Sequence, residues 1–135
     1  MSEFALQLAA ALALTIVIEC AVVALLGARR ADEFAAVAAV NVITNPALNV
    51  LVTACDWVGA VAVSRLGASD RVVTLVYVAI VGIAEIAVVL IEWRLLLWTL
   101  GGRSRAWLVR SAVMNATSLL LGSWLLAQLA EHRLI

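Results

Sequence analysis

Three acidic residues, Glu19, Glu85 and Glu92, lie inside long apolar stretches of the sequence. A charged side chain at the centre of a bilayer costs on the order of 2.5 to 3.5 kcal/mol on insertion scales. The cheaper states of such an acid are the protonated form and a carboxylate paired with a cation or with amide donors. Acids in this setting commonly belong to ion pathways, proton relays or ligand sites. The alternative is a neutral glutamate that hydrogen-bonds two helices together.

Amide and hydroxyl side chains recur every three or four residues in the segment from 41 to 53. These residues, which share one face of a helix, are Asn41, Thr44, Asn45, Asn49 and Thr53. Pro46 interrupts the segment, and because proline has no amide hydrogen, the carbonyl of Val42 loses its helical donor. We therefore predict a kink at Pro46 and a free carbonyl near the asparagines, an arrangement with which transporters coordinate ions and substrates. The alternative is a kink whose carbonyl is satisfied by Thr44 or by a neighbouring helix.

A second polar face lies between residues 111 and 122. Its members follow one another at spacings of four, three and four: Ser111, Asn115, Ser118 and Gly122. Small residues at this spacing let helix backbones approach closely, which accounts for every member except Asn115. Asn115 is therefore the main candidate for binding on this face, and Ser118 follows it by three residues, as Thr44 follows Asn41.

The two halves of the chain resemble each other in the positions of their polar residues. Glu19, Phe34, Asn41 and Thr44 correspond to Glu92, Trp107, Asn115 and Ser118. The glutamate precedes the asparagine by 22 positions in one half and by 23 in the other. This agreement predicts two parallel-repeat helical hairpins, at about residues 4–66 and 72–131, related by an axis along the membrane normal. In each hairpin the carboxyl and the carboxamide lie at equal depth, on the order of 10 Å below the connecting loop, so that they can pair.

The composition predicts an all-α membrane protein. Hydrophobic residues make up 66% of the 135 residues and charged residues only 13%, unlike the composition of soluble domains. Four apolar stretches are long enough to cross a hydrocarbon layer of about 30 Å: Ala5–Ala28, Phe34–Ala54, Val72–Leu100 and Trp107–Ala130. Because they lack the alternating polarity of barrel strands, we predict four transmembrane helices in a single domain, residues 1–135. The segment 58–66 either extends the second helix or lies along the membrane interface.

The charge distribution predicts the orientation of the chain and excludes one class of partner. The formal net charge is zero and every Lys or Arg position is Arg, so the sequence has no basic stripe for a nucleic acid. Five arginines surround the first and third loops: Arg29, Arg30, Arg103, Arg105 and Arg110. Because fewer lie elsewhere, the positive-inside rule predicts that loops one and three are cytoplasmic in a bacterial inner membrane.

Together these residues predict an oxygen-only binding site inside the membrane. Its members are Glu19, Asn41, Thr44, Asn45, Asn49, Glu85, Glu92, Asn115 and Ser118. Carboxyl, amide and hydroxyl groups suit protons, hard metal cations, or the ammonium and hydroxyl groups of a small polar metabolite. The sequence therefore predicts a small transporter or channel that needs no cofactor and has room for a bound cation. Because four helices are a thin wall for a substrate path, we expect a homodimer or another homo-oligomer.

Two other functions fit the same residues. An intramembrane enzyme, such as a metal-dependent lipid hydrolase or transferase, would use the acids as metal ligands or as a general base. The apolar stretches contain no Ser-His, Cys-His or His-rich pattern, so we favour transport over catalysis. A non-catalytic accessory subunit would use its polar residues only to dock a larger membrane partner.

Overall fold

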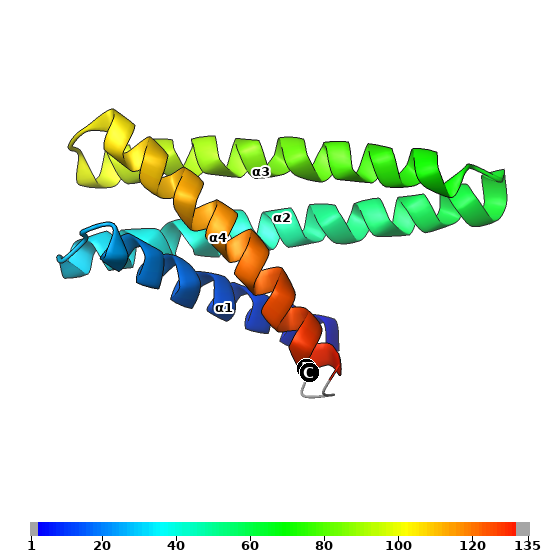
Figure 1. The fold of residues 1–135 in the computed structure, drawn as a ribbon, viewed down its shortest axis with the longest axis horizontal. Helices are drawn as coiled ribbons and strands as arrows, with labels where there is room; N and C mark the ends of the chain where they lie inside the picture. The colour runs from blue at the N-terminus through cyan, green and yellow to red at the C-terminus, as the bar shows by residue number, and fades with distance from the viewer. Residues whose placement is uncertain (1–2, 132–135) are drawn as a thin grey trace.

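Four helices make up the part of the chain that the computed structural model describes, residues 3–131. In chain order they are α1 (Glu3–Leu25), α2 (Ala31–Leu66), α3 (Asp70–Leu100) and α4 (Ser104–Glu131) (Figure 1). The all-helical architecture predicted from the sequence is therefore confirmed for these residues.

Three of the helices are long and apolar enough to cross a membrane. The stretches concerned are Ala5–Leu25, Ala31–Leu66 and Asp70–Leu100. α2 has 36 residues, so at about 1.5 Å per residue it is much longer than a hydrocarbon layer of about 30 Å requires. Segment 58–66 therefore extends this helix, which is the first of the two alternatives that the sequence left open for it. A membrane crossing by α4 stays a prediction, and so does a kink at Pro46, which lies inside α2.

The ends of α2 follow from local chemistry. The Glu33 carboxylate accepts hydrogen bonds from the backbone N–H groups of Arg29 at 3.0 Å and Arg30 at 3.1 Å, two donors left without helical partners. At the other end Gly67 adopts a left-handed conformation with φ of 63°, and its N–H bonds to the carbonyl of Ala62. Nothing between these two caps stops the helix, since even Pro46 is accommodated.

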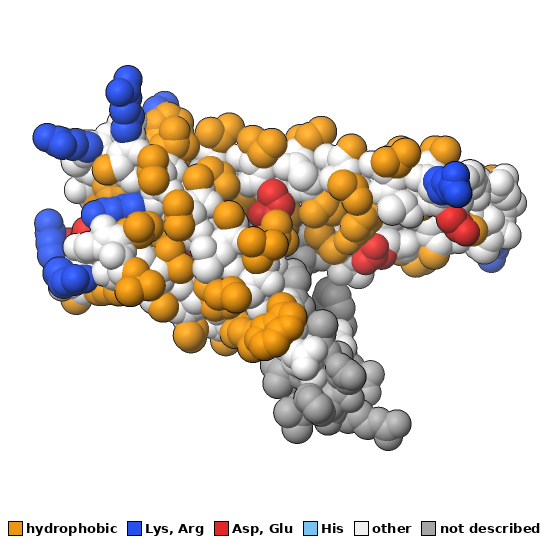
Figure 2. Space-filling view, in the orientation of Figure 1, with side chains coloured by type: hydrophobic (Ala, Val, Ile, Leu, Met, Phe, Trp, Pro, Cys, Tyr) orange, Lys and Arg blue, Asp and Glu red, His pale blue; other side chains and the backbone are white. Residues whose placement is uncertain are grey.

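The helices form a ring in which each contacts two neighbours: α1 packs on α2, α2 on α3, α3 on α4, and α4 on α1. The α1–α2 and α3–α4 loops lie at one end of the molecule, which we call the loop end (Figure 1). α2 and α3 continue as a pair beyond α1 and α4 at the opposite end (Figure 1). Basic side chains gather at the loop end (Figure 2).

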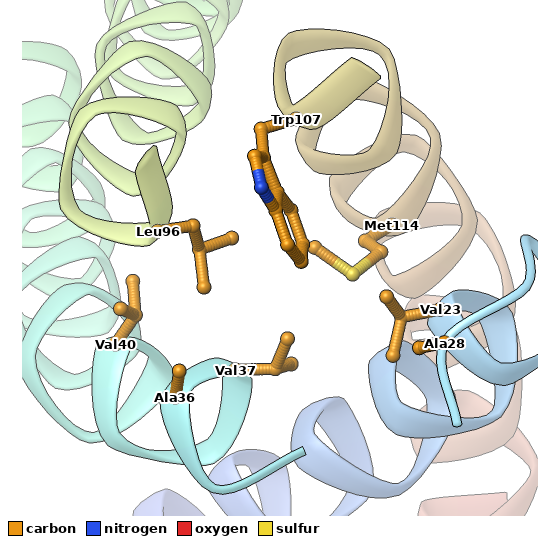
Figure 3. Packing of buried hydrophobic residues seen from close by; sticks show 8 residues of the cluster. All are labelled: Val23, Ala28, Ala36, Val37, Val40, Leu96, Trp107 and Met114. Atoms are coloured by element: carbon orange, nitrogen blue, oxygen red, sulfur yellow. The ribbon is translucent and has the colours of Figure 1, made fainter. Parts of the chain in front are cut away.

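An apolar core fills the bundle near the loop end. Its buried members are Val23, Ala28, Ala36, Val37, Val40, Leu96, Trp107 and Met114 (Figure 3). The Trp107 ring and the Met114 side chain both point into the space between the helices (Figure 3). The indole N–H of Trp107 donates to the carbonyl of Gly101 at 2.8 Å, so this polar atom is satisfied inside the core.

Arg110, on α4, covers the core where it meets the loops. Its guanidinium lies 4.7 Å from the centroid of the Trp107 ring and donates to the carbonyl of Leu26 at 3.2 Å. The same group is 3.6 Å from the carboxylate of Glu33 on α2. One cation thus joins α4 to the end of α1 and the start of α2, and the loop end is closed by an apolar layer beneath an ion pair.

Candidate functional site

The carboxyl group of Glu19, on α1, lies in the centre of the bundle, and the residue is only 1% exposed. Asn41 Nδ2, on α2, donates to its Oε2 at 2.6 Å. Ser118 Oγ, on α4, donates to its Oε1 at 3.0 Å. The two oxygens of this carboxyl therefore accept hydrogen bonds from two different helices.

Glu92, on α3, has the corresponding position in the other hairpin and is also 1% exposed. Asn115 Nδ2, on α4, donates to its Oε2, and Ser111 Oγ lies 3.3 Å from the same oxygen. Thr44 Oγ1, on α2, donates to its Oε1 at 2.9 Å. Glu92 therefore has one donor more than Glu19, and that donor is Ser111.

The two carboxyls obtain their donors in the same way. Each receives its carboxamide from the adjacent helix of its own hairpin, Asn41 for Glu19 and Asn115 for Glu92. Each receives a hydroxyl from the other hairpin, Ser118 for Glu19 and Thr44 for Glu92. The hydroxyl that serves one glutamate lies three residues after the asparagine that serves the other. These contacts join all four helices at one level of the bundle.

Every donor to these carboxyls also has an acceptor elsewhere on the backbone. Asn41 and Asn115 each bond the carbonyl four residues earlier in their own helix, at 3.1 Å and 3.0 Å. Thr44 is 3.1 Å from the carbonyl of Val40, and Ser118 is 3.1 Å from that of Asn115. Ser111 donates to the carbonyl of Val89 on α3 at 3.0 Å. A hydroxyl has a single proton, so Thr44 and Ser118 can each serve the carboxyl or their own helix, but not both fully at one time.

The rest of the asparagine stripe on α2 connects to α1. Asn49 Nδ2 donates to the side-chain oxygen of Asn45 at 2.8 Å and to its backbone carbonyl at 3.0 Å. Asn45 Nδ2 in turn donates to the hydroxyl of Thr15 on α1 at 3.0 Å. Thr53 bonds the carbonyl of Asn49 in its own helix and is exposed. The stripe is therefore a chain of hydrogen bonds that ends on α1.

A cavity of about 240 Å³, which we call the central pocket, lies next to these hydrogen bonds on the side away from the loop end. Its polar lining consists of Thr15, Asn41, Thr44, Asn45, Asn49, Tyr77, Glu85, Glu92, Asn115 and Ser118. Every residue predicted for the site lines this pocket except Glu19, which touches the lining through Asn41 and Ser118. The described lining residues include no basic side chain.

Glu85 differs from the other two acids. It lines the central pocket and is half-buried, yet within the described chain its carboxyl has no hydrogen bond and no ion pair. It lies seven residues, or about 10 Å along α3, further from the loop end than Glu92. The pocket therefore contains one carboxyl with three donors and one carboxyl that is available to a ligand.

Sequence reasoning missed three contributors to the site. Ser111 was assigned to helix packing, but it is fully buried and lies within hydrogen-bonding distance of Glu92. Thr15 partners Asn45 and lies four residues before Glu19, a spacing that places both on one face of α1. Tyr77 lines the pocket from the far part of α3. The signal for Thr15 was present in its spacing from Glu19, whereas Tyr77 has no such signal.

Among the described residues, no group of three or more His, Cys, Asp or Glu side chains lies close enough together to hold a metal ion. Each of the two buried carboxyls instead has its own set of neutral donors. Such a set can orient a carboxyl and exchange a proton or a cation at it.

Comparison of the chain with protein-family models, with curated proteins and with solved structures gives no match.

Proposed function

We propose that the protein is a small membrane transporter or channel whose central pocket binds a proton, a cation or a small polar substrate. The observation that carries this proposal is the exchangeable hydrogen bonding of Glu19 and Glu92. The hydroxyls of Thr44, Ser111 and Ser118 each have a second acceptor on the backbone, so a ligand can take over a carboxyl oxygen without leaving these buried donors unsatisfied.

The charge of the pocket supports a cationic ligand. Its charged lining residues are the acids Glu85 and Glu92, and Arg110, which covers the core at the loop end, is paired with Glu33. Carboxyl, amide and hydroxyl oxygens are the ligands that hard cations and ammonium groups prefer. In this mechanism Glu85 receives the cation, Glu92 and Glu19 bind it or exchange a proton for it, and the asparagines orient it.

The proposal also includes an internal repeat, a kink in α2, an orientation in the membrane and an oligomeric state. The shared donor pattern of Glu19 and Glu92 supports two parallel-repeat hairpins that move against each other around the pocket. A kink at Pro46 gives α2 a flexible point beside Asn45. We place the loop end in the cytoplasm of a bacterial inner membrane and expect a homo-oligomer, for which the exposed apolar ends of α2 and α3 offer a surface.

Flux measurements in liposomes test the proposal. Purified protein is reconstituted, and proton flux is followed with an internal pH-sensitive dye while uptake of radiolabelled sodium and methylammonium is counted. We expect Glu85→Gln and Glu92→Gln to reduce flux severalfold or more, because glutamine keeps the shape of the side chain but carries no negative charge and takes up no proton. Glu19→Gln is expected to reduce flux as well.

A matched variant controls for changes in charge alone. Asp70→Asn removes an acid at the start of α3, outside the central pocket, and is expected to leave flux unchanged. Wild-type flux in all three glutamine variants would show that the proposed mechanism is wrong. Each variant is checked for its helical content, so that loss of folding is not counted as loss of transport.

A further inference from the structure

A groove on the outside of the bundle runs between α3 and α4. It has a volume of about 330 Å³, and its apolar walls are formed by Ile86, Val89, Leu90, Ala112, Ala116 and Leu119. Ile86, Leu90 and Leu119 are exposed, and in a membrane-spanning bundle exposed apolar side chains face lipid. The lining of the groove also includes an acid, Glu85. The groove therefore opens to hydrocarbon and is not purely apolar.

Glu85 and Asn115 provide the polar part of this groove, and both also line the central pocket. Leu119 borders the two spaces as well. The groove and the pocket are thus neighbours separated by side chains that belong to both. Glu85 lines the groove, whereas Glu19 and Glu92 do not, so it is the acid that a ligand entering through the groove meets first.

We propose that this groove is a lateral entrance from the bilayer and that the ligand is an amphiphilic cation, an ammonium head group on a hydrocarbon tail. The head group pairs with Glu85, and the amide oxygen of Asn115 accepts a hydrogen bond from it. The tail stays in the groove between Ile86 and Leu119. This inference rests on the proposed function and names the substrate class for it.

Complementarity favours this occupant over others. A small hydrated ion gains nothing from an apolar groove, and a neutral lipid can offer a carboxyl group a hydrogen bond but no opposite charge. An amphiphilic cation uses both features, because its tail replaces lipid against the groove walls while its charge finds an acid at membrane depth. Ala112 and Ala116 leave the space that the tail occupies, since each lines the groove with a single methyl group.

Chemical labelling tests the entrance directly in proteoliposomes of the full chain. Dicyclohexylcarbodiimide, which dissolves in the bilayer, is compared with a cationic water-soluble carbodiimide, and the labelled glutamate is identified by mass spectrometry. We expect the membrane-soluble reagent to modify Glu85 severalfold faster than Glu19 or Glu92. We also expect dodecylammonium to slow this labelling severalfold and dodecanol, which has the same tail without the charge, to leave it unchanged.

Variants of α4 separate the groove from the rest of the surface. Ala116→Trp fills the groove. We expect it to slow the labelling of Glu85 severalfold and to weaken the protection by dodecylammonium severalfold. Ala112→Leu is a milder variant if the tryptophan prevents folding. Val113→Trp places the same side chain on an exposed position of α4 that does not line the groove, and it is expected to behave as wild type. If both groove variants behave as wild type, the lateral entrance is wrong. If dodecanol protects Glu85 as well as dodecylammonium does, the ligand is not a cation.

Failure of this inference differs from failure of the proposed function. Labelling reports access to Glu85 and occupancy of the groove, whereas the liposome assay reports flux. Protected labelling together with wild-type flux in all glutamine variants contradicts the proposed glutamate mechanism of transport and leaves the binding site standing. Glutamate-dependent flux of sodium or protons with no membrane-side labelling of Glu85 contradicts only the lateral entrance.

Discussion

Glu19 and Glu92 have nearly the same contacts but different surroundings. Both are 1% exposed, and each is held by one carboxamide from its own hairpin and one hydroxyl from the other. Ser111, which contacts Glu92, lies four residues before Asn115. The equivalent residue in the first hairpin is Val37, four residues before Asn41, and its side chain has no donor for Glu19. Seven residues before Glu92 is a second acid, Glu85, whereas Leu12 occupies that place before Glu19.

The two glutamates also differ in how they meet the central pocket. Glu92 lines the central pocket directly, while Glu19 reaches it only through Asn41 and Ser118. The additional polar groups, Ser111 and Glu85, both lie on the side of Glu92. We therefore expect ligand exchange to be concentrated at the second hairpin, with Glu19 holding the four helices in register. Three predictions test this comparison.

The largest expected effect comes from removing each carboxyl entirely. Glu92→Ala and Glu19→Ala both lose a fully buried side chain and its hydrogen bonds, and we expect each to lower the free energy of unfolding by about 2–4 kcal/mol. Glu92→Ala should lower the free energy of unfolding more than Glu19→Ala does, by about the contribution of one hydrogen bond, because the Glu92 carboxyl has three donors and the Glu19 carboxyl has two. Unfolding in mixed micelles, followed by circular dichroism, measures both. Equal losses would mean that Ser111 contributes nothing to the Glu92 site.

The pairing of each glutamate with the asparagine of its own hairpin was predictable from the sequence. Depth below a loop is a count of residues, and 22 and 23 positions put Glu19 beside Asn41 and Glu92 beside Asn115. The hydroxyl partners were not assigned, because they depend on the order of the helices in the ring and on the rotation of each helix about its axis. Neither property is encoded in spacing along one helix.

The helical architecture was predicted better than the extent of its helices. The apolar lengths predicted the helices, but they bounded the second apolar stretch at Ala54 and left open whether segment 58–66 extends the helix. The helix continues to Leu66 because one acid does not break a helix, whereas the left-handed Gly67 does end it. Ser111 was assigned to packing for a similar reason, since a small residue facing a neighbouring helix has the same spacing whether or not its hydroxyl finds an acceptor.

An intermediate effect is expected from Ser111, the residue that distinguishes the two sites. Ser111→Ala should lower the free energy of unfolding by about 1 kcal/mol, because a hydrogen bond between membrane helices contributes on average about 0.6 and at most about 1.7 kcal/mol. A double-mutant cycle with Glu92→Gln should give a measurable coupling energy, and a cycle with Glu19→Gln should give none beyond about 0.3 to 0.5 kcal/mol. Coupling of Ser111 to both glutamates would show that the two sites form one network.

The smallest effects should come from the hydroxyls that cross between the hairpins, Thr44 and Ser118. Thr44→Val and Ser118→Ala each remove one donor to a carboxyl, and each is expected to lower the free energy of unfolding by about 0.6 kcal/mol. The losses are small because each hydroxyl is already shared with a carbonyl of its own helix, at 3.1 Å in both cases. The two losses should also be similar, because Thr44 and Ser118 each donate one hydrogen bond to the glutamate of the other hairpin. A much larger loss for one variant, measured in the same micelles, would mean that the hairpins are not equivalent at the level where they meet. The difference between Glu19 and Glu92 would then extend beyond Ser111 and Glu85 to the contacts that join the two halves.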